Sequence, residues 1–331
     1  MIYLDNAATT QPKFFRQERS DDWFNSNTPY AHREQSSLEM ARERIKKCLN
    51  VKGGYVLFFR CATEAIEWLF NASNEWENIS YSHFSHDSII SANRKLNGVG
   101  EGTLYVDQFI NPITGDTILE CVKYNAVKNV FIGCDYTASI GHAVLPKNPK
   151  YDFIFFSGHK FYTEKGIGAM WISDRLGKYL GANKDPKNQY NLVHGTVDVQ
   201  GARMLANAME FVQHYLYFDH MLKELCTQFN INNIEFDIVA LNKTSKSSAI
   251  NAIYLPNINA DALQTYLASK DIYIGVAHSA CAGTEDYRVL EAMGFSKEIA
   301  SQTIRVSFSV DTTVDEVRQF AEEIKNFKEM F

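Results

Sequence analysis

The chain has 331 residues, a formal net charge of −6, 45% hydrophobic residues and 22% charged residues. This length is sufficient for two domains with a large core, and the composition is ordinary for a soluble globular protein. Because the charge is mildly acidic and no basic stripe is present, we do not expect direct binding of nucleic acid. The first residues lack the basic region and apolar run of a signal peptide, and no apolar stretch is long enough to cross a bilayer, so we expect a cytoplasmic protein without a membrane segment.

Six cysteines are present, and no two of them form a Cys-x-x-Cys pair. A structural zinc site is therefore not expected. With no export signal, reduced thiols are expected rather than disulfides.

The first half of the chain alternates short apolar runs with helical patterns. A helix is predicted over residues 35–50, and further helices over 63–72 and 86–96. The predicted strands are 55–59, 79–82, 103–106, 130–134, 152–157 and 168–172. Strands separated by helices are typical of an α/β layer with a mostly parallel sheet.

The pattern changes after about residue 195. A long helical segment is predicted over residues 200–229, followed by strands at 248–255, 272–276 and 303–308 and helices at 261–269 and after residue 314. We therefore predict a large domain of residues 12–229 and a smaller α+β domain that combines residues 1–11 with residues 230–331.

Lys160 has the most informative surroundings in the sequence. It ends the run Ser157-Gly158-His159-Lys160, which follows an apolar strand and precedes the glycine-rich stretch 165–169. A lysine in such a turn can bind an aldehyde cofactor covalently as a Schiff base. The alternative is a surface lysine beside a solvated histidine.

Three other segments of the first half could complete a cofactor site. Thr63 opens a helix after a strand, where backbone N–H groups bind anions such as phosphate, although a simple helix N-cap would look the same. Asp135 ends a buried strand, which is where α/β folds place ligands. His86 lies in a strand-to-helix turn, where a capping or surface role is the alternative to a contact with a cofactor.

Two segments of the second half carry further candidates. Cys281 lies among small residues between a strand and a helix, which favours an accessible thiol; a buried structural cysteine is the alternative. Arg305 lies within an apolar strand, where a buried guanidinium must find a partner.

These segments together resemble the cysteine desulfurases of the class V pyridoxal-phosphate-dependent aminotransferase family. Ser-x-His-Lys followed by Lys-Gly-x-Gly-Ala resembles the family's cofactor-lysine segment, and residues 62–65 resemble its phosphate turn. The stretch 278–284 resembles the family's Gly-Ser-Ala-Cys loop, and residues 3–10 match its N-terminal Tyr-Leu-Asp-Asn-Ala-Ala-Thr-Thr. The likeness runs from Ile2 to about Phe320.

The resemblance implies the aspartate-aminotransferase-type fold (fold type I), in which a large domain with a mostly parallel seven-stranded sheet accompanies a smaller α+β domain. It also implies pyridoxal 5'-phosphate, a homodimer, and conversion of L-cysteine to L-alanine with a persulfide on the enzyme. A sulfur-acceptor protein or a small thiol would take up that sulfur.

The resemblance also assigns roles to individual residues. It makes Lys160, Cys281 and His86 catalytic. The cofactor would be bound by Ala62, Thr63, His86, Asp135, Ser157, His159, Lys160 and, across a dimer interface, Thr196. The substrate would be bound by Arg305, Asn6 and Asn111.

The chain departs from the family pattern at several positions. Cys61 replaces a glycine of the phosphate turn, and Ala138 replaces a glutamine that bonds the 3-hydroxyl group of the cofactor. Around Asn111 the family motif is only faintly echoed. The alternatives are therefore another class V enzyme that does not use Cys281, such as an aminotransferase, a C–S lyase or a selenocysteine lyase, and a non-catalytic subunit that binds a partner.

Overall fold

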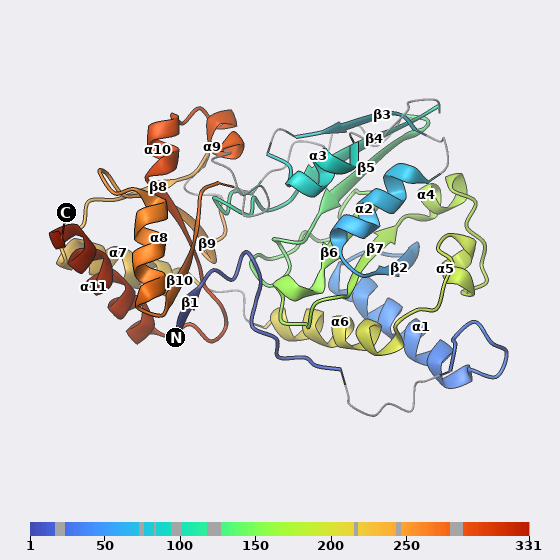
Figure 1. The fold of residues 1–331 in the computed structure, drawn as a ribbon. Coiled ribbons are helices and arrows are strands. Elements are labelled where there is room, and N and C mark those ends of the chain that lie inside the picture. The colour runs from blue at the N-terminus through green and yellow to red at the C-terminus, as the bar shows by residue number, and fades with distance from the viewer. Residues whose placement is uncertain are drawn as a thin grey trace. The chain divides into compact units, whose positions relative to one another are not determined.

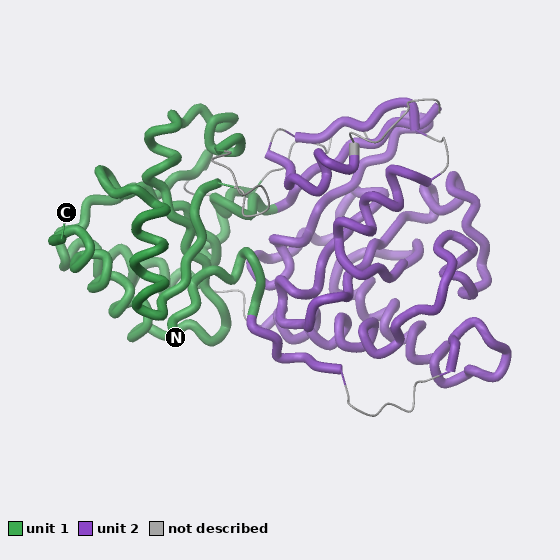
Figure 2. The backbone as a smooth tube through the Cα atoms, in the orientation of Figure 1, with its two compact units in different colours: residues 1–10, 110–118, 215–331 green, residues 11–109, 119–214 purple. Residues whose placement is uncertain are grey.

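The computed structural model describes residues 1–16, 24–72, 76–82, 84–93, 101–117, 127–214, 218–242, 246–278 and 287–330. The chain divides into two compact units (Figure 2). Unit 1 comprises residues 1–10, 110–118 and 215–331, and unit 2 comprises residues 11–109 and 119–214. No helix within the described ranges is both long and apolar enough to cross a membrane.

Two stretches of the predicted large domain, residues 110–118 and 215–229, belong to unit 1, and Gln11 belongs to unit 2. Residues 110–118 belong to unit 1 because Asp116 forms an isolated β-bridge with Lys246 and its carboxylate accepts hydrogen bonds from the N–H groups of Leu241 and Asn242. Residues 215–229 belong to unit 1 because helix α7 (Asp219–Ile231) packs against α11 (Val314–Met330).

A six-stranded sheet forms the centre of unit 2, with the strand order β2-β7-β6-β5-β4-β3 (Figure 1). Neighbouring strands from β3 to β6 are parallel, whereas β7 is antiparallel to both β2 and β6. The strands are β2 (Tyr55–Phe59), β3 (Trp76–Tyr81), β4 (Gly102–Gln108), β5 (Val130–Asp135), β6 (Phe153–Ser157) and β7 (Gly168–Ile172). All six strands predicted from the sequence pattern are present, and the seventh, which came from the family resemblance, is not among the described strands.

Helix α2 shows how the core of unit 2 is built. Five of its apolar residues follow helical spacing and are buried, namely Ala62, Ala65, Ile66, Leu69 and Phe70, and they belong to the same cluster as Phe153 and Phe155 of β6. The other helices are α1 (His32–Cys48), α3 (Asp87–Asn93), α4 (Asp174–Tyr179), α5 (Asn188–Asn191) and α6 (Val199–Val212), with the 3-10 turn η2 (Gly158–Lys160). The α1 and α6 helices pack against each other.

Unit 1 contains a five-stranded sheet with the order β1-β10-β11-β9-β8. β1 pairs with β10 in parallel, and the remaining pairs are antiparallel. The strands are β1 (Ile2–Leu4), β8 (Asp237–Val239), β9 (Ile250–Tyr254), β10 (Ile272–Val276) and β11 (Thr303–Ser307). Helix α8 (Ala260–Ser269) packs on β10, and the short helices α9 (Arg288–Ala292) and α10 (Lys297–Ser301) precede β11. This is an α+β arrangement.

Candidate active site

Two parallel strands of unit 2 end at the candidate cofactor site. Asp135 is the last residue of β5 and Ser157 is the last residue of β6, and these strands are neighbours in the sheet. Because the carboxyl ends of parallel strands meet at one edge, the topology places these two residues together with His159 and Lys160 of η2, directly after β6. The sequence-predicted lysine segment and carboxylate are therefore brought to the same edge.

The Asp135 carboxylate is buried, and its Oδ1 accepts a hydrogen bond from the Thr137 N–H at 2.8 Å. Burial raises the pKa of Asp135, while the hydrogen bonds from Thr137 and the positive charge of Lys160 act in the opposite direction. Lys160 therefore lies close enough to influence this carboxylate. A protonated pyridine nitrogen would supply the further positive charge that favours an ionised carboxylate at this depth, so the site fits the cofactor ring.

The N-terminus of α2 forms the second part of the site. The Ala62 N–H donates to Ser157 Oγ at 2.7 Å, and both residues are buried. This bond joins the start of the ten-residue helix to the lysine segment. Cys61 is extended and its side chain does not cap the helix, while Thr63 is exposed in the first turn. This helix end, with the Thr63 hydroxyl, fits a phosphate group, although the Ala62 N–H itself is directed to Ser157.

Two histidines are influenced by the charge of Lys160. Burial, followed by the charge of Lys160, lowers the pKa of His159 to about 4, and the same two causes lower the pKa of His142 to about 4. Both imidazoles are therefore neutral near pH 7. Sequence reasoning missed His142. The available signal was a histidine in the short turn that follows Asp135 at the end of a buried strand.

His86 has a capping role in the structure. Its Nδ1 accepts from the Ser88 N–H at 3.2 Å and lies 2.9 Å from Ser88 Oγ, at the start of α3. The side chain is half-buried. The capping alternative is therefore observed, and the contact between His86 and the cofactor ring stays a prediction.

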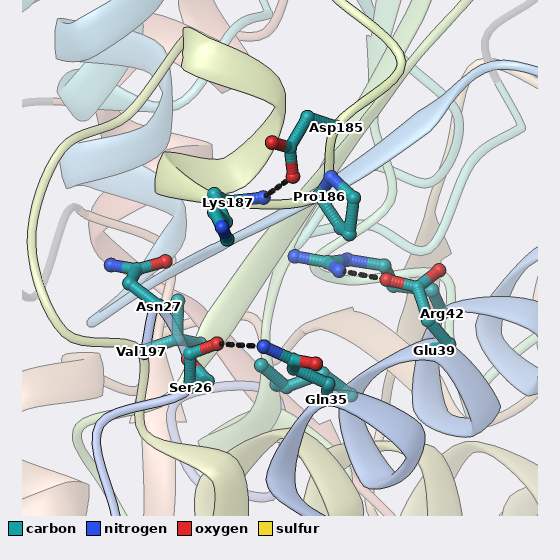
Figure 3. A pocket seen from close by; sticks show the side chains of 10 residues that line it. Ser26, Asn27, Gln35, Glu39, Arg42, Asp185, Pro186, Lys187 and Val197 are labelled. Carbon is teal, nitrogen blue, oxygen red and sulfur yellow. Dashed lines mark hydrogen bonds and ion pairs between the residues drawn. The ribbon is translucent and has the colours of Figure 1, made fainter. Parts of the chain in front are cut away.

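Thr196 lies in an exposed segment between α5 and α6. Its neighbour Val197 lines a cavity of about 240 Å³ between α1 and the stretch 185–197 (Figure 3). The fully buried Arg42 of this cavity is paired with Glu39 and stacks on Tyr190. No sequence-predicted site residue within the described ranges lines this cavity.

Unit 1 contains the three predicted substrate-binding residues. The Arg305 guanidinium donates from Nη2 to Asp5 Oδ1 at 2.7 Å and from Nη1 to the Pro112 carbonyl at 3.2 Å. Asn6 is buried and donates to the carbonyls of Tyr3 and Ser307.

Asn111 orders the loop that it begins. Its Oδ1 accepts from the N–H groups of Ile113 and Thr114 at 2.8 and 3.1 Å. Its Nδ2 is buried and has no hydrogen-bond acceptor among the described residues. The predicted thiol Cys281 lies outside the described residues, as does His83.

Residues 110–320, more than half of the chain, match the model of the aminotransferase class-V family. The curated cysteine desulfurase IscS of Clostridium botulinum (strain Kyoto / Type A2) is 24% identical over 375 aligned residues, which cover 96% of this chain and 91% of that protein. Cysteine desulfurase 2 of Trichormus variabilis is 26% identical and covers 96% of this chain and 90% of its own length.

A solved structure titled NifS-like protein superposes with a TM-score of 0.82 at 22% identity and covers 100% of both chains. At this identity the likeness shows the fold alone. The chain is thus an enzyme of the fold type I class, which binds pyridoxal 5'-phosphate. It belongs to the aminotransferase class-V family. The family, fold class and cofactor predicted from the sequence are confirmed.

Proposed function

We propose that this protein is a cysteine desulfurase, which converts L-cysteine to L-alanine and retains the sulfur as a persulfide on Cys281. The observation that carries the proposal is the placement of Lys160 with the buried carboxylate of Asp135 at the ends of β5 and β6. The curated relatives named above, which cover 96% of this chain, support the choice of substrate.

When bound, the cofactor supplies an electron sink for the bonds that break and form at the substrate. In this proposal the Lys160 amine holds the cofactor aldehyde and Asp135 accepts the ring N–H. Thr63 and the start of α2, together with Ser157 and His159, bind the phosphate group. The neutral state of His159 suits a donor to phosphate oxygens, because a neutral imidazole still carries one N–H.

The remaining residues of the proposal bind the substrate and move protons. Arg305 binds the α-carboxylate, since a planar guanidinium offers two parallel donors to a carboxylate. Asn6 and Asn111 shape the surroundings of that carboxylate. Lys160 and His86 would move protons at the substrate.

The sulfur-transfer step needs a thiolate. The Cys281 thiolate attacks the substrate sulfur, the C–S bond breaks, and its electron pair returns to carbon, which takes up a proton to give alanine. The products are L-alanine and a Cys281 persulfide, and no external oxidant or reductant is required. Release of the sulfur then needs an acceptor protein or a small thiol.

We also propose a homodimer in which Thr196 reaches the phosphate bound by the other subunit, which its exposed position supports. A cytoplasmic location is supported by the free thiols of Cys48, Cys61, Cys134 and Cys226.

Mass spectrometry after incubation with L-cysteine tests the proposal. We expect 32 additional mass units, one sulfur atom, on Cys281 alone, together with alanine in the solution. The variant Cys281→Ser should still bind the cofactor but produce neither persulfide nor sulfide, and Cys226→Ser is the matched control. Continued release of sulfur from L-cysteine by the Cys281→Ser protein would favour a C–S lyase or selenocysteine lyase. Activity that requires a 2-oxo acid would favour an aminotransferase.

A further inference from the structure

Arg305 lies at the centre of the small sheet between two strands that carry small residues. In the register of the sheet it stands opposite Gly275 of β10 and Ala252 of β9. The side chain is 9% exposed, so its charge is almost fully removed from water. A buried guanidinium in this position depends on the few groups that surround it.

The partners of Arg305 are few and come from distant parts of the sequence. Asp5 accepts from Nη2 at 2.7 Å and the Pro112 carbonyl accepts from Nη1 at 3.2 Å. Nε is buried and has no acceptor among the described residues. Because Asp5 is bonded to one terminal nitrogen only, the guanidinium keeps donor capacity for a second carboxylate.

Gly275 makes room for this ion pair. A Cβ atom at position 275 would lie 2.7 Å from Arg305 Nε, 2.7 Å from Asp5 Oδ1 and 2.9 Å from Arg305 Nη2. The backbone of Gly275 is not in the left-handed region, so a turn does not explain the glycine. The glycine is explained by the side chains of Arg305 and Asp5, which lie over position 275 and leave no room for a Cβ atom.

The turn that carries Asp5 is attached to the end of β11. Asp5 forms a parallel β-bridge with Ser307, Asn6 Nδ2 donates to the Ser307 carbonyl at 2.9 Å, and the Ala7 N–H donates to Ser307 Oγ at 2.8 Å. Three consecutive residues thus bind one residue that lies two positions beyond Arg305. The Asp5 carboxylate is thereby held against the guanidinium.

We propose that Asp5 and Gly275 are positioning residues that hold Arg305 in the orientation that binds the α-carboxylate of the substrate. The Asp5 carboxylate accepts a hydrogen bond from Arg305 Nη2 and so holds the guanidinium. Gly275 has no Cβ atom and leaves space for this ion pair over β10. A preorganised guanidinium loses less rotational freedom when the carboxylate binds, so the two residues strengthen substrate binding and leave the chemical steps unchanged. This inference rests on the proposed role of Arg305.

The first test uses the cofactor-loaded protein and the variants Asp5→Ala and Asp5→Asn. Asp5→Ala should raise KM for L-cysteine roughly ten- to hundredfold, as expected for loss of a charge-assisted hydrogen bond, with kcat within about threefold of wild type. Asp5→Asn should recover most of this loss, because its amide oxygen still accepts from Nη2. A purely structural role would not produce this separation of KM from kcat.

The second test uses Gly275→Ala, with Tyr273→Phe on the same strand as the matched control. Gly275→Ala should raise KM as Asp5→Ala does, and the double variant should show little additional effect, because both changes disturb one ion pair. Calorimetry should show a parallel loss of affinity for the product L-alanine. Tyr273→Phe should behave as wild type.

Different results would overturn the positioning role of Asp5 and Gly275 and the desulfurase assignment. A KM and an L-alanine affinity within about twofold of wild type in both Asp5→Ala and Gly275→Ala, or a lowered KM, would overturn the positioning role. A wild-type protein that binds L-alanine but releases no sulfur from cysteine would overturn the desulfurase assignment, while the L-alanine measurements would still test Asp5 and Gly275. A wild-type protein that binds neither amino acid would overturn both.

Discussion

The hydrogen bond between Ser157 and Ala62 joins the lysine segment to the phosphate turn, and its removal by Ser157→Ala is expected to weaken both stability and cofactor binding. The bond is 2.7 Å long and both residues are buried, so the variant leaves the Ala62 N–H without its acceptor. An unsatisfied buried donor costs about 1–3 kcal/mol. For a unit of about two hundred residues this corresponds to a fall of roughly 2–12 °C in Tm.

The same substitution should weaken the cofactor complex, because the start of α2 is no longer held against the lysine segment. A loss of about 1.4 kcal/mol in binding free energy would raise the dissociation constant about tenfold. Differential scanning fluorimetry measures Tm without cofactor, and titration followed by visible absorption measures the dissociation constant.

Ser296→Ala is the matched control, because Ser296 is an exposed N-cap of α10 in unit 1 whose Oγ accepts from the Ile299 N–H at 3.3 Å. It should lose at most about 1 kcal/mol of stability and should not alter cofactor affinity. A Ser157→Ala protein with the Tm and cofactor affinity of wild type would refute the reasoning.

Three further predictions concern buried ionisable groups. Asp135→Asn should retain the fold but lose most of the catalytic rate, because an amide cannot hold a protonated ring nitrogen as a carboxylate does; circular dichroism and alanine production measure the two effects. His142 has a folded pKa of about 4, so between the ordinary value near 6.5 and about 4 the unfolded chain binds more protons and stability falls as the pH falls; urea unfolding of His142→Asn should show a smaller loss over this range than wild type. Lys246 donates from its partly buried Nζ to the carbonyls of Ser247 and Ile250 and to Asn251 Oδ1, so Lys246→Met should lower the free energy of unfolding by about 1–3 kcal/mol, and an unchanged urea midpoint would contradict this account.

The sequence by itself determined the local architecture of unit 2 and the identity of its central residues. The strands of the large sheet follow from short apolar runs, most clearly β5, β6 and β7, whose residues are almost all buried and form continuous apolar segments, whereas most residues of β3 are exposed or half-buried. Asp135 and Lys160 could be found because Asp135 ends a buried strand and Lys160 ends the short turn after the next one, where the fold places ligands. The glycines and hydroxyl residues around Lys160 completed that prediction.

Only the tertiary structure decided which distant segments meet. Residues 110–118 belong to unit 1 because the Asp116 carboxylate accepts from backbone N–H groups more than a hundred positions later in the chain, and no periodicity records such a bond. His142 gave only the weak signal of its place in the turn after Asp135, because the lowered pKa of its side chain comes from burial and from the nearby charge of Lys160.

The pairing of Arg305 with Asp5 is the clearest case of a contact between distant segments that the sequence alone did not predict. The sequence required a partner for the buried arginine, because an unpaired charge is too costly inside a sheet. The choice of Asp5, and with it the reason for Gly275, depends on β1 and β11 lying in one sheet although about three hundred residues separate them. Local sequence patterns predict which kind of partner a residue requires, and the tertiary structure determines which residue is that partner.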